Sequence, residues 1–307
     1  MECDLCFRPG LRSISLFSPF VSHSKLVTRH ATLVLSDVHR IQSNIDAGLY
    51  SCGVFIDLKK AFNTVDHIIL LNKLSHYGIR GIINDWLASY LTDRTQTTQV
   101  EASISSKGKI LFGFPQVSVL GPLLFLIYVN DIYRVSSKLN FFLFADDTNI
   151  LYANNNLKSL ESVVNEELRK VCEWLNTNKL SLNTSKSNFV IFHPFQRKPD
   201  YNVTLKMYGN DLKILTSLER KHYVKYLGVL IDSHLSWRYH IEYISSKISK
   251  GVGIIARLRH FVPTSTLLKL YRSLIEPYIS YGLTAWGQVA NSILNIAKTS
   301  STVNVLF

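Results

Sequence analysis

The stretch "LNFFLFADDTNILYANN" (residues 139–155) decides the fold that we expect for this chain. Apolar and aromatic residues lead to two adjacent aspartates, Asp146 and Asp147, and a second apolar run follows them. This pattern predicts a strand, a tight turn and a second strand, with the aspartates at the turn. Because aspartate is favoured in turns, an isolated pair of this kind is more often a turn signal than a functional site.

Asp57 strengthens the functional interpretation. The stretch "YSCGVFIDL" (50–58) predicts a buried strand that ends in this residue. If the two predicted strand regions are neighbours in one sheet, three carboxylates converge on one edge and repel each other. Hard divalent cations such as Mg²⁺ are bound by carboxylates together with substrate phosphates, and two such ions can support phosphoryl transfer. The sequence therefore favours a metal-dependent phosphoryl-transfer site over a simple turn.

The composition is that of a globular protein with a basic surface. Hydrophobic residues make up 47% and charged residues 18% of 307 residues, and the net charge is +12. The excess of positive charge favours a polyanionic partner, either nucleic acid or an anionic membrane surface, over a merely solvated basic surface. The longest apolar run, residues 119–129, is far shorter than the ~20 residues of a membrane span. We therefore expect no membrane span, and of the two polyanionic partners we expect nucleic acid and no membrane.

Cysteine usage predicts a reducing compartment. The chain has Cys3, Cys6, Cys52 and Cys172. Cys3 and Cys6 have the spacing of metal ligands, but no second Cys/His pair follows at zinc-finger distance. We interpret all four as free thiols.

Hydrophobic periodicity predicts helices alternating with hairpins. The segments with helical spacing are 31–45, 65–77, 79–91, about 119–131, 157–176, 238–260 and 265–276. Strands are predicted at 50–58, 188–193, 203–208 and 226–231, with a further hairpin over 97–113 that turns around Ser105–Gly108. This order is typical of an α+β fold with an antiparallel sheet packed on helices.

Five stretches in order resemble the sequence blocks of a reverse transcriptase of the non-LTR (LINE-type) retrotransposon class. They are "GVFIDLKKAFNTVDH" (53–67), "GFPQVSVLGPLLFLIYVNDI" (113–132), "FLFADDTNILY" (142–152), "KLSLNTSKSNFVIF" (179–192) and "VKYLGVLIDSHLSW" (224–237). The resemblance covers about residues 31–286 and implies a polymerase palm. It implies remnant fingers with an unplaced N-terminus over 1–46, the palm over 47–234, thumb-like helices over 235–287 and a disordered or unplaced tail over 288–307.

The resemblance also implies a catalytic centre. Asp57 and Asp146 match the family's metal-binding aspartates, the carbonyl of Leu58 matches a further ligand, and Asp147 matches the catalytic neighbour of Asp146. The implied cofactor is a pair of Mg²⁺ ions, for which Mn²⁺ can substitute.

Further positions match nucleotide-binding residues of the family. Phe62 matches the aromatic gate against the ribose 2′-hydroxyl, although a core phenylalanine is an equal reading. Gln116 matches the glutamine that packs against the incoming nucleotide and template, and Val117 occupies the next position of this nucleotide-binding segment. Lys186 matches a lysine near the triphosphate, and a surface lysine is its alternative.

The last block and the helices after it match nucleic-acid contacts. Tyr226, Leu227 and Gly228 match the turn that grips the primer end. Five cations on the following helices either contact phosphates or form an ordinary solvated face: Lys247, Lys250, Arg257, Arg259 and Lys269.

The implied activity is RNA-directed DNA synthesis from an RNA template, a DNA primer and dNTPs, in the nucleus or a cytoplasmic ribonucleoprotein. Three departures lead us to expect a truncated, partly degenerate copy. Val117 replaces a glycine, and a stiff β-branched side chain there crowds the nucleotide. Asn63 replaces an aspartate, and only 56 residues precede Asp57, so we expect neither complete fingers nor an endonuclease upstream. An inactive remnant that binds nucleic acid without sequence preference is the alternative function.

Overall fold

The computed structural model describes residues 23–114, 118–208 and 215–287, with side chains from Val34 onward. These residues form two compact units, which are described separately. The first lies within Cys52–Phe189 and Tyr201–Arg220, and the second within Val21–Ser51, Val190–Asp200 and Lys221–Phe307.

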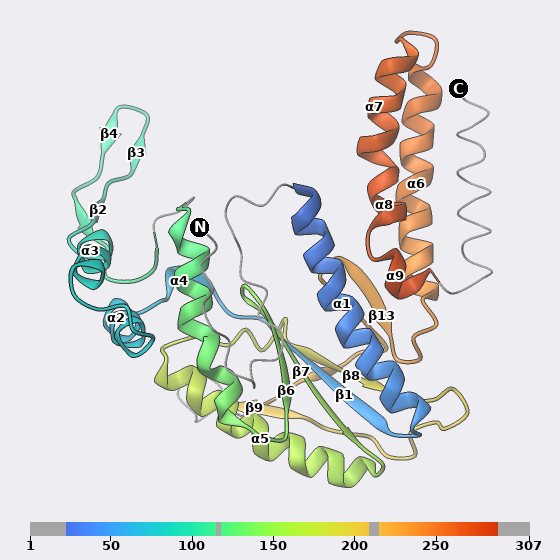
Figure 1. The fold of residues 1–307 in the computed structure, drawn as a ribbon, viewed down its shortest axis with the longest axis horizontal. Helices are drawn as coiled ribbons and strands as arrows, with labels where there is room; N and C mark the ends of the chain where they lie inside the picture. The colour runs from blue at the N-terminus through green and yellow to red at the C-terminus, as the bar shows by residue number, and fades with distance from the viewer. Residues whose placement is uncertain (1–22, 115–117, 209–214, 288–307) are drawn as a thin grey trace. The chain divides into compact units, whose positions relative to one another are not determined.

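The first unit holds the larger sheet together with helices and short hairpins (Figure 1). Its helices are η1 (Ala61–Asn63), α2 (His67–His76), α3 (Ile82–Leu91), α4 (Leu120–Val129), η2 (Asn130–Val135) and α5 (Leu157–Thr177). Its strands are β2 (Thr95–Gln96), β3 (Gln99–Val100), β4 (Ser103–Ile104), β5 (Gly108–Lys109), β6 (Asn140–Phe144), β7 (Asp147–Asn154), β9 (Lys206–Tyr208), β10 (Leu215–Ser217) and β11 (Glu219–Arg220). β1 (Tyr50–Ile56) and β8 (Asn188–Phe192) each run from one unit into the other.

The five-stranded sheet has the order β11-β8-β1-β7-β6. β6 and β7 are antiparallel with Phe144 opposite Asp147, so that Ala145 and Asp146 alone form the turn. Ala145 has a φ of 50°, the left-handed geometry that such a tight hairpin turn requires. β11 pairs with β8 in parallel.

α5 shows how the apolar stripe of a helix becomes core. The side chain of Asn156, the residue before α5, accepts hydrogen bonds from the backbone N–H groups of Lys158 and Ser159 and so caps the first turn. The buried apolar residues recur at helical spacing: Leu157, Leu160, Val164, Leu168, Val171 and Leu175. This face packs against β7 and β9 (Figure 1), as the predicted amphipathic helix requires.

The second unit contains the long helices near the C-terminus. It comprises α1 (His23–Asp46), β12 (Tyr223–Tyr226), β13 (Val229–Asp232), α6 (Arg238–Leu258), α7 (Thr264–Leu274), α8 (Glu276–Ser280) and α9 (Leu283–Trp286). α6 and α7 lie side by side (Figure 1), and α6 also contacts β13 and α8. Gly251 of α6 allows this close packing, because a Cβ there would lie 3.0 Å from the side chain of Ile275.

The α+β fold and all seven predicted helices are confirmed, but two strand predictions are wrong in detail. Residues 226–231 form a hairpin instead of one strand, since Leu227 (φ 44°) and Gly228 (φ 87°) reverse the chain between β12 and β13. The hairpin over 97–113 turns at Glu101, next to the β3–β4 pair, and not at Ser105–Gly108. In the first case the apolar run concealed a reversal, and in the second the turn-forming residues gave the right element and the wrong reversal point.

α3 exposes most of its apolar face. Leu87 and Leu91 are buried, whereas Ile82 is 87% and Trp86 56% exposed. Periodicity therefore located this helix correctly, and only its C-terminal half supplies core residues. None of the helices that the structure describes is long and apolar enough to span a bilayer.

Cys52 and Cys172 are buried free thiols, as predicted. Burial raises the pKa of Cys172 to about 11, so this thiol stays protonated at neutral pH. Cys3 and Cys6, and the predictions for the tail 288–307, lie outside the described residues. The predicted domain boundaries stay a prediction.

Candidate active site

The structure brings the three predicted aspartates to one end of two neighbouring strands. Asp57 directly follows β1, Asp146 lies in the β6–β7 turn, and Asp147 begins β7, which lies beside β1 in the sheet. The pKa of Asp147 is raised to about 6, first by burial of its carboxyl group and then by the negative charges of Asp146 and Asp57. The three carboxylates are therefore close enough to repel one another, as the sequence predicts.

Asp57 is held in place by the segment that precedes β8. The side-chain amide of Asn183 donates a hydrogen bond to Oδ2 of Asp57 at 2.6 Å. The backbone N–H of Asp57 donates to Oγ of Ser187 at 3.1 Å, and the backbone N–H of Asn183 donates to the carbonyl of Asp57 at 2.9 Å. These bonds fix both the backbone and one carboxylate oxygen of Asp57.

The carbonyl of Leu58 accepts none of the backbone hydrogen bonds between residues 57–59 and 181–183. Leu58 and Leu182 are opposite each other in an isolated antiparallel bridge. The hydrogen bonds on either side are made by Lys59 to Ser181 and by Asn183 to Asp57. The predicted further ligand is thus a backbone oxygen outside the ladder bonds, directly after Asp57.

Sequence reasoning missed Asn183 and chose its neighbour Lys186. Lys186 lies exposed in the turn that begins at Asn183, and its backbone N–H donates to the carbonyl of Asn183 at 3.2 Å. Asn183 stands in the quoted block 179–192, but asparagine in a turn normally indicates local turn bonding. Only its tertiary contact identifies it as part of the site.

The donor set suits a hard divalent cation in chemistry. Asp57, Asp146 and Asp147 offer carboxylate oxygens whose mutual repulsion a cation would relieve. Within the described residues, no group of three or more His, Cys, Asp or Glu side chains is arranged so that it could hold a metal ion. One Asp57 oxygen is instead occupied by Asn183. The three carboxylates therefore have the right chemistry for a cation and lie near one another, but they are not arranged as a metal site in this structure.

Phe62, five residues after Asp57, packs against an aromatic residue of the core. It is half-buried, and its ring lies 4.7 Å from that of Phe125. Its carbonyl accepts a hydrogen bond from the backbone N–H of Phe114 at 3.1 Å. This contact supports a core role for Phe62, and the role as a gate stays a prediction.

Gly113 allows the backbone before residue 115 to approach the backbone of Phe62 and Asn63 closely. Gly113 has a φ of 76°, and a Cβ on it would lie 2.7 Å from Cα of Asn63. Only glycine fits this combination of conformation and contact. Gln116 and Val117 lie outside the described residues.

Asp66 has a structural role. It is 4% exposed, caps α2 by accepting from the N–H groups of Ile68 and Ile69, and pairs with Lys179 at 2.6 Å. Burial alone would raise the pKa of Asp66, but the bonds from Lys179 and the two backbone N–H groups lower it overall. This aspartate is thus an anchor between two segments of the first unit.

The predicted primer-binding residues lie in the second unit. Tyr226 is buried, and Leu227 and Gly228 form the turn between β12 and β13. The hydroxyl of Tyr281 donates to the carbonyl of Leu227, and a Cβ on Gly228 would lie 3.2 Å from the Tyr281 ring. Tyr281 therefore supports this turn from behind.

The predicted phosphate-contacting cations are on α6, α7 and the residue after α6. Lys247 lies 5.6 Å from the centroid of the Tyr243 ring. Lys250, Arg257, Arg259 and Lys269 are exposed. Contact with phosphates and simple solvation both stay open for this group.

The model of the family described as reverse transcriptase (RNA-dependent DNA polymerase) matches residues 11–231. A probable RNA-directed DNA polymerase from the transposon X-element of Drosophila melanogaster is 27% identical over 86% of the chain and 29% of its own length. The RNA-directed DNA polymerase from the mobile element jockey of the same species is 29% identical over 80% of the chain and 27% of its own length.

The chain thus spans less than a third of these curated relatives. Among solved structures, telomerase from Candida tropicalis in complex with a telomeric RNA fragment aligns with 93% of the chain and 50% of that chain, at 10% identity and a TM-score of 0.44.

Proposed function

The chain belongs to the reverse transcriptase family, and we propose that it forms the catalytic core of an RNA-directed DNA polymerase of a LINE-type retrotransposon. The proposed reaction is transfer of a deoxynucleotide to a primer 3′-hydroxyl, directed by an RNA template. The relatives from the X-element and jockey support this class of element.

One observation carries the proposal: Asp57, Asp146 and Asp147 lie together at the ends of neighbouring strands. A carboxylate cluster that raises the pKa of its own member is unfavourable without a cation. Reverse transcriptases of this family generally use divalent metal ions, and we propose a pair of Mg²⁺ ions here, with Mn²⁺ as a substitute.

Asp57, Asp146 and the carbonyl of Leu58 would hold the metal ions. When bound, they would neutralise the triphosphate and favour ionisation of the primer hydroxyl. Asn183 orients Asp57 for this role by holding one of its two carboxylate oxygens. Asp147 contributes negative charge beside Asp146 without a separate ligand role.

The nucleotide would be positioned by residues around this cluster. We assign the gate against the 2′-hydroxyl to Phe62, which the contact with Phe125 holds rigidly. Gln116 and Val117 would pack against the nucleotide, and Lys186 would approach the triphosphate. The exposure of Lys186 in a turn leaves its ammonium group available to a phosphate.

The primer end would contact Tyr226, Leu227 and Gly228. Their turn is stiffened by the bond from Tyr281 to the Leu227 carbonyl. The partners of the whole reaction are an RNA template, a DNA primer and dNTPs.

Primer extension on an RNA template tests this function. We expect incorporation of dNTPs with Mg²⁺ or Mn²⁺, and its loss in Asp146→Asn and in Asp57→Asn. Asp200→Asn, which changes an exposed aspartate, is the control with matched charge.

Val117→Gly tests the predicted crowding of the nucleotide. We expect this variant to extend primers faster than the natural chain, because glycine removes a branched side chain at the nucleotide. Absence of synthesis by both proteins with either metal would contradict the polymerase. Salt-sensitive binding alone, with log K falling linearly with log salt, would then indicate a nucleic-acid-binding remnant.

A further inference from the structure

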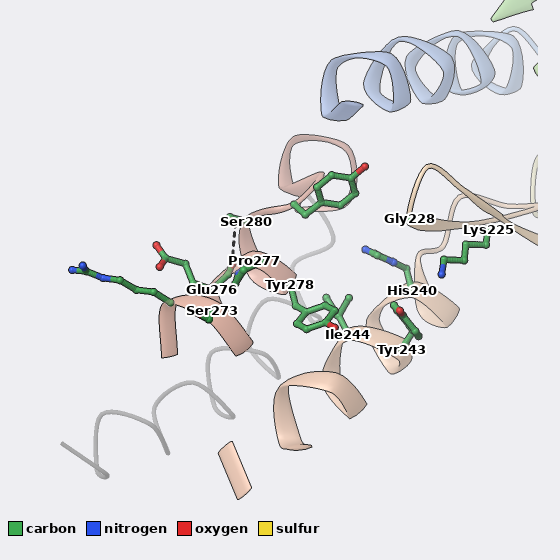
Figure 2. A pocket seen from close by; sticks show the side chains of 12 residues that line it. Lys225, Gly228, His240, Tyr243, Ile244, Ser273, Glu276, Pro277, Tyr278 and Ser280 are labelled. Carbon is green, nitrogen blue, oxygen red and sulfur yellow. Dashed lines mark hydrogen bonds between the residues drawn. The ribbon is translucent and has the colours of Figure 1, made fainter. Parts of the chain in front are cut away.

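The second unit contains a cavity that is lined in part by Gly228 of the proposed primer-binding turn, and the other residues that line it carry none of the polymerase roles above. Its volume is about 670 Å³, within the usual range for small-molecule sites. The residues on which the argument rests are His240, Tyr243, Tyr278, Tyr281, Lys225 and Glu276. They come from β12, α6, α8 and the residue after α8 (Figure 2).

His240 supplies an unused hydrogen-bond donor to this cavity. Its residue is 2% exposed. Its Nδ1 accepts from the backbone N–H of Leu230 at 3.4 Å, so the neutral ring carries its proton on Nε2. Nε2 is buried without a hydrogen-bond partner among the described residues. A buried donor left unpaired is destabilising, which makes an acceptor on a ligand favourable at this position.

Packing keeps the imidazole of His240 in its orientation. Its ring lies 5.5 Å from that of Trp286 and 6.4 Å from that of Trp237, both edge-on. Figure 2 shows the imidazole directed into the cavity, on the side of Tyr278. The two tryptophan rings therefore hold Nε2 of His240 in a fixed position.

The walls of the cavity are aromatic. Tyr243, Tyr278 and Tyr281 line it, and the Tyr281 hydroxyl is occupied by the Leu227 carbonyl. Tyr281 thus offers the cavity its ring more than its hydroxyl. Aromatic walls of this kind bind planar rings by stacking.

Charged side chains lie at the rim of the cavity. The ammonium group of Lys225 lies 5.7 Å from the centroid of the Tyr243 ring, which places it at the cavity wall. Glu276 lies on the opposite side in Figure 2 and is exposed. Because Arg272 of α7 also lines the cavity, the charged residues of the lining are two cations and one carboxylate, and an anionic group of a ligand is attracted to Lys225.

We propose that this cavity binds a nucleobase with its phosphate: the planar base stacks among the tyrosines, accepts a hydrogen bond from His240 Nε2, and places the phosphate at Lys225. A free nucleotide and an unpaired base of a nucleic acid strand share this chemistry. The site lies wholly within the second unit and does not depend on the carboxylates of the first.

Binding of AMP and of a short single-stranded oligoadenylate to the full chain tests the proposal. Both are measured with a chelator present, by quenching of the fluorescence of the four tryptophans of the chain, of which Trp237 and Trp286 lie beside His240. We expect His240→Leu, Tyr278→Leu and Lys225→Gln each to weaken binding about tenfold, as loss of a stacking or hydrogen-bond contact does. Lys198→Gln, an exposed lysine of the second unit outside the cavity lining, is the control and keeps full affinity.

The two sources give different results. Binding of AMP that depends on these residues supports a free nucleotide, whereas dependence seen only with the oligonucleotide supports an unpaired base. If an abasic oligonucleotide binds as tightly as oligoadenylate and no cavity variant changes the affinity for either probe, the proposal is wrong. Lys225→Gln and Tyr278→Leu keep the test valid if His240→Leu fails to fold, because Lys225 is exposed and Tyr278 half-exposed. Primer extension is independent of this result, so the two proposals fail separately.

Discussion

The side-chain amide of Asn183 donates a 2.6 Å hydrogen bond to the carboxylate of Asp57, although the two residues are 126 positions apart. The amide oxygen of Asn183 in turn accepts from Oγ of Ser185 at 2.8 Å. This short chain of bonds fixes which Asp57 oxygen stays available. It makes Asn183 a positioning residue for the proposed reaction.

Asn183→Ala should lower the maximal rate of primer extension about tenfold and raise the metal concentration needed for half-maximal rate. The reason is that Asp57 loses a charge-assisted hydrogen bond, which is worth roughly 1.5–3 kcal/mol. Steady-state rates across a Mg²⁺ titration measure both effects. Ser185→Ala, one bond further from Asp57, should have a smaller effect. A purely structural role for Asn183 would change the melting temperature and leave the metal dependence unchanged.

Gly113→Ala should destabilise the first unit by more than about 2 kcal/mol. The new Cβ would lie 2.7 Å from Cα of Asn63, and alanine disfavours the φ of 76° at this position. Urea denaturation measures the loss. Gly108→Ala is the matched control, since its Cβ would meet nothing closer than the Gln96 oxygen at 3.8 Å. Equal effects of the two substitutions would contradict this account.

Asp66→Ala should cost about 2–4 kcal/mol of the free energy of unfolding. The substitution removes the cap of α2 and leaves Lys179 without its 2.6 Å partner. Asp66→Asn should cost less, because the amide oxygen can still cap the helix. Chemical denaturation at pH 7 compares the two. If both variants were as stable as the natural chain, the anchoring role of Asp66 would be excluded.

The stability of the second unit should fall as the pH is lowered from about 6.5 to 4. Burial lowers the pKa of His240 from 6.5 to about 4, so the unfolded chain takes up the proton first. The free energy of unfolding is therefore highest above pH 6.5, where His240 is neutral in both states. It falls by up to about 3 kcal/mol as the pH is lowered towards 4, because the unfolded chain binds the proton more tightly. Denaturation at pH 7 and pH 5 should show a difference that shrinks in His240→Gln. An unchanged difference in that variant would assign it to other groups.

Removal of divalent cations should lower the melting temperature at pH 7. A cation bound by the carboxylate cluster relieves the repulsion that raises the pKa of Asp147 and binds only the folded chain. At about 100 times the dissociation constant, this adds about 2.7 kcal/mol. Thermal melts with Mn²⁺ and with a chelator measure the shift, and Asp146→Asn should abolish most of it. A shift that survives in that variant would place the cation elsewhere.

The elements near the site were predictable because their signals are local. The alternation around Asp146 and Asp147 predicted the β6–β7 hairpin, and the stripe of α5 predicted its buried face. The reversal at Leu227 was not predictable from alternation, because an apolar residue in a left-handed turn looks like one more strand residue. The exposed face of α3 was also missed, since periodicity shows that a face is apolar and not what covers it.

The sequence by itself determined the helices, the hairpin that carries Asp146 and Asp147, and the strand that leads to Asp57, because periods of 2 and 3.6 residues follow from backbone geometry. The tertiary structure alone decided that Asn183 holds Asp57, that burial raises the pKa of Asp147, and that Nε2 of His240 lacks a partner among the described residues. Those features depend on distances between residues far apart in the chain, and on burial, which only packing sets.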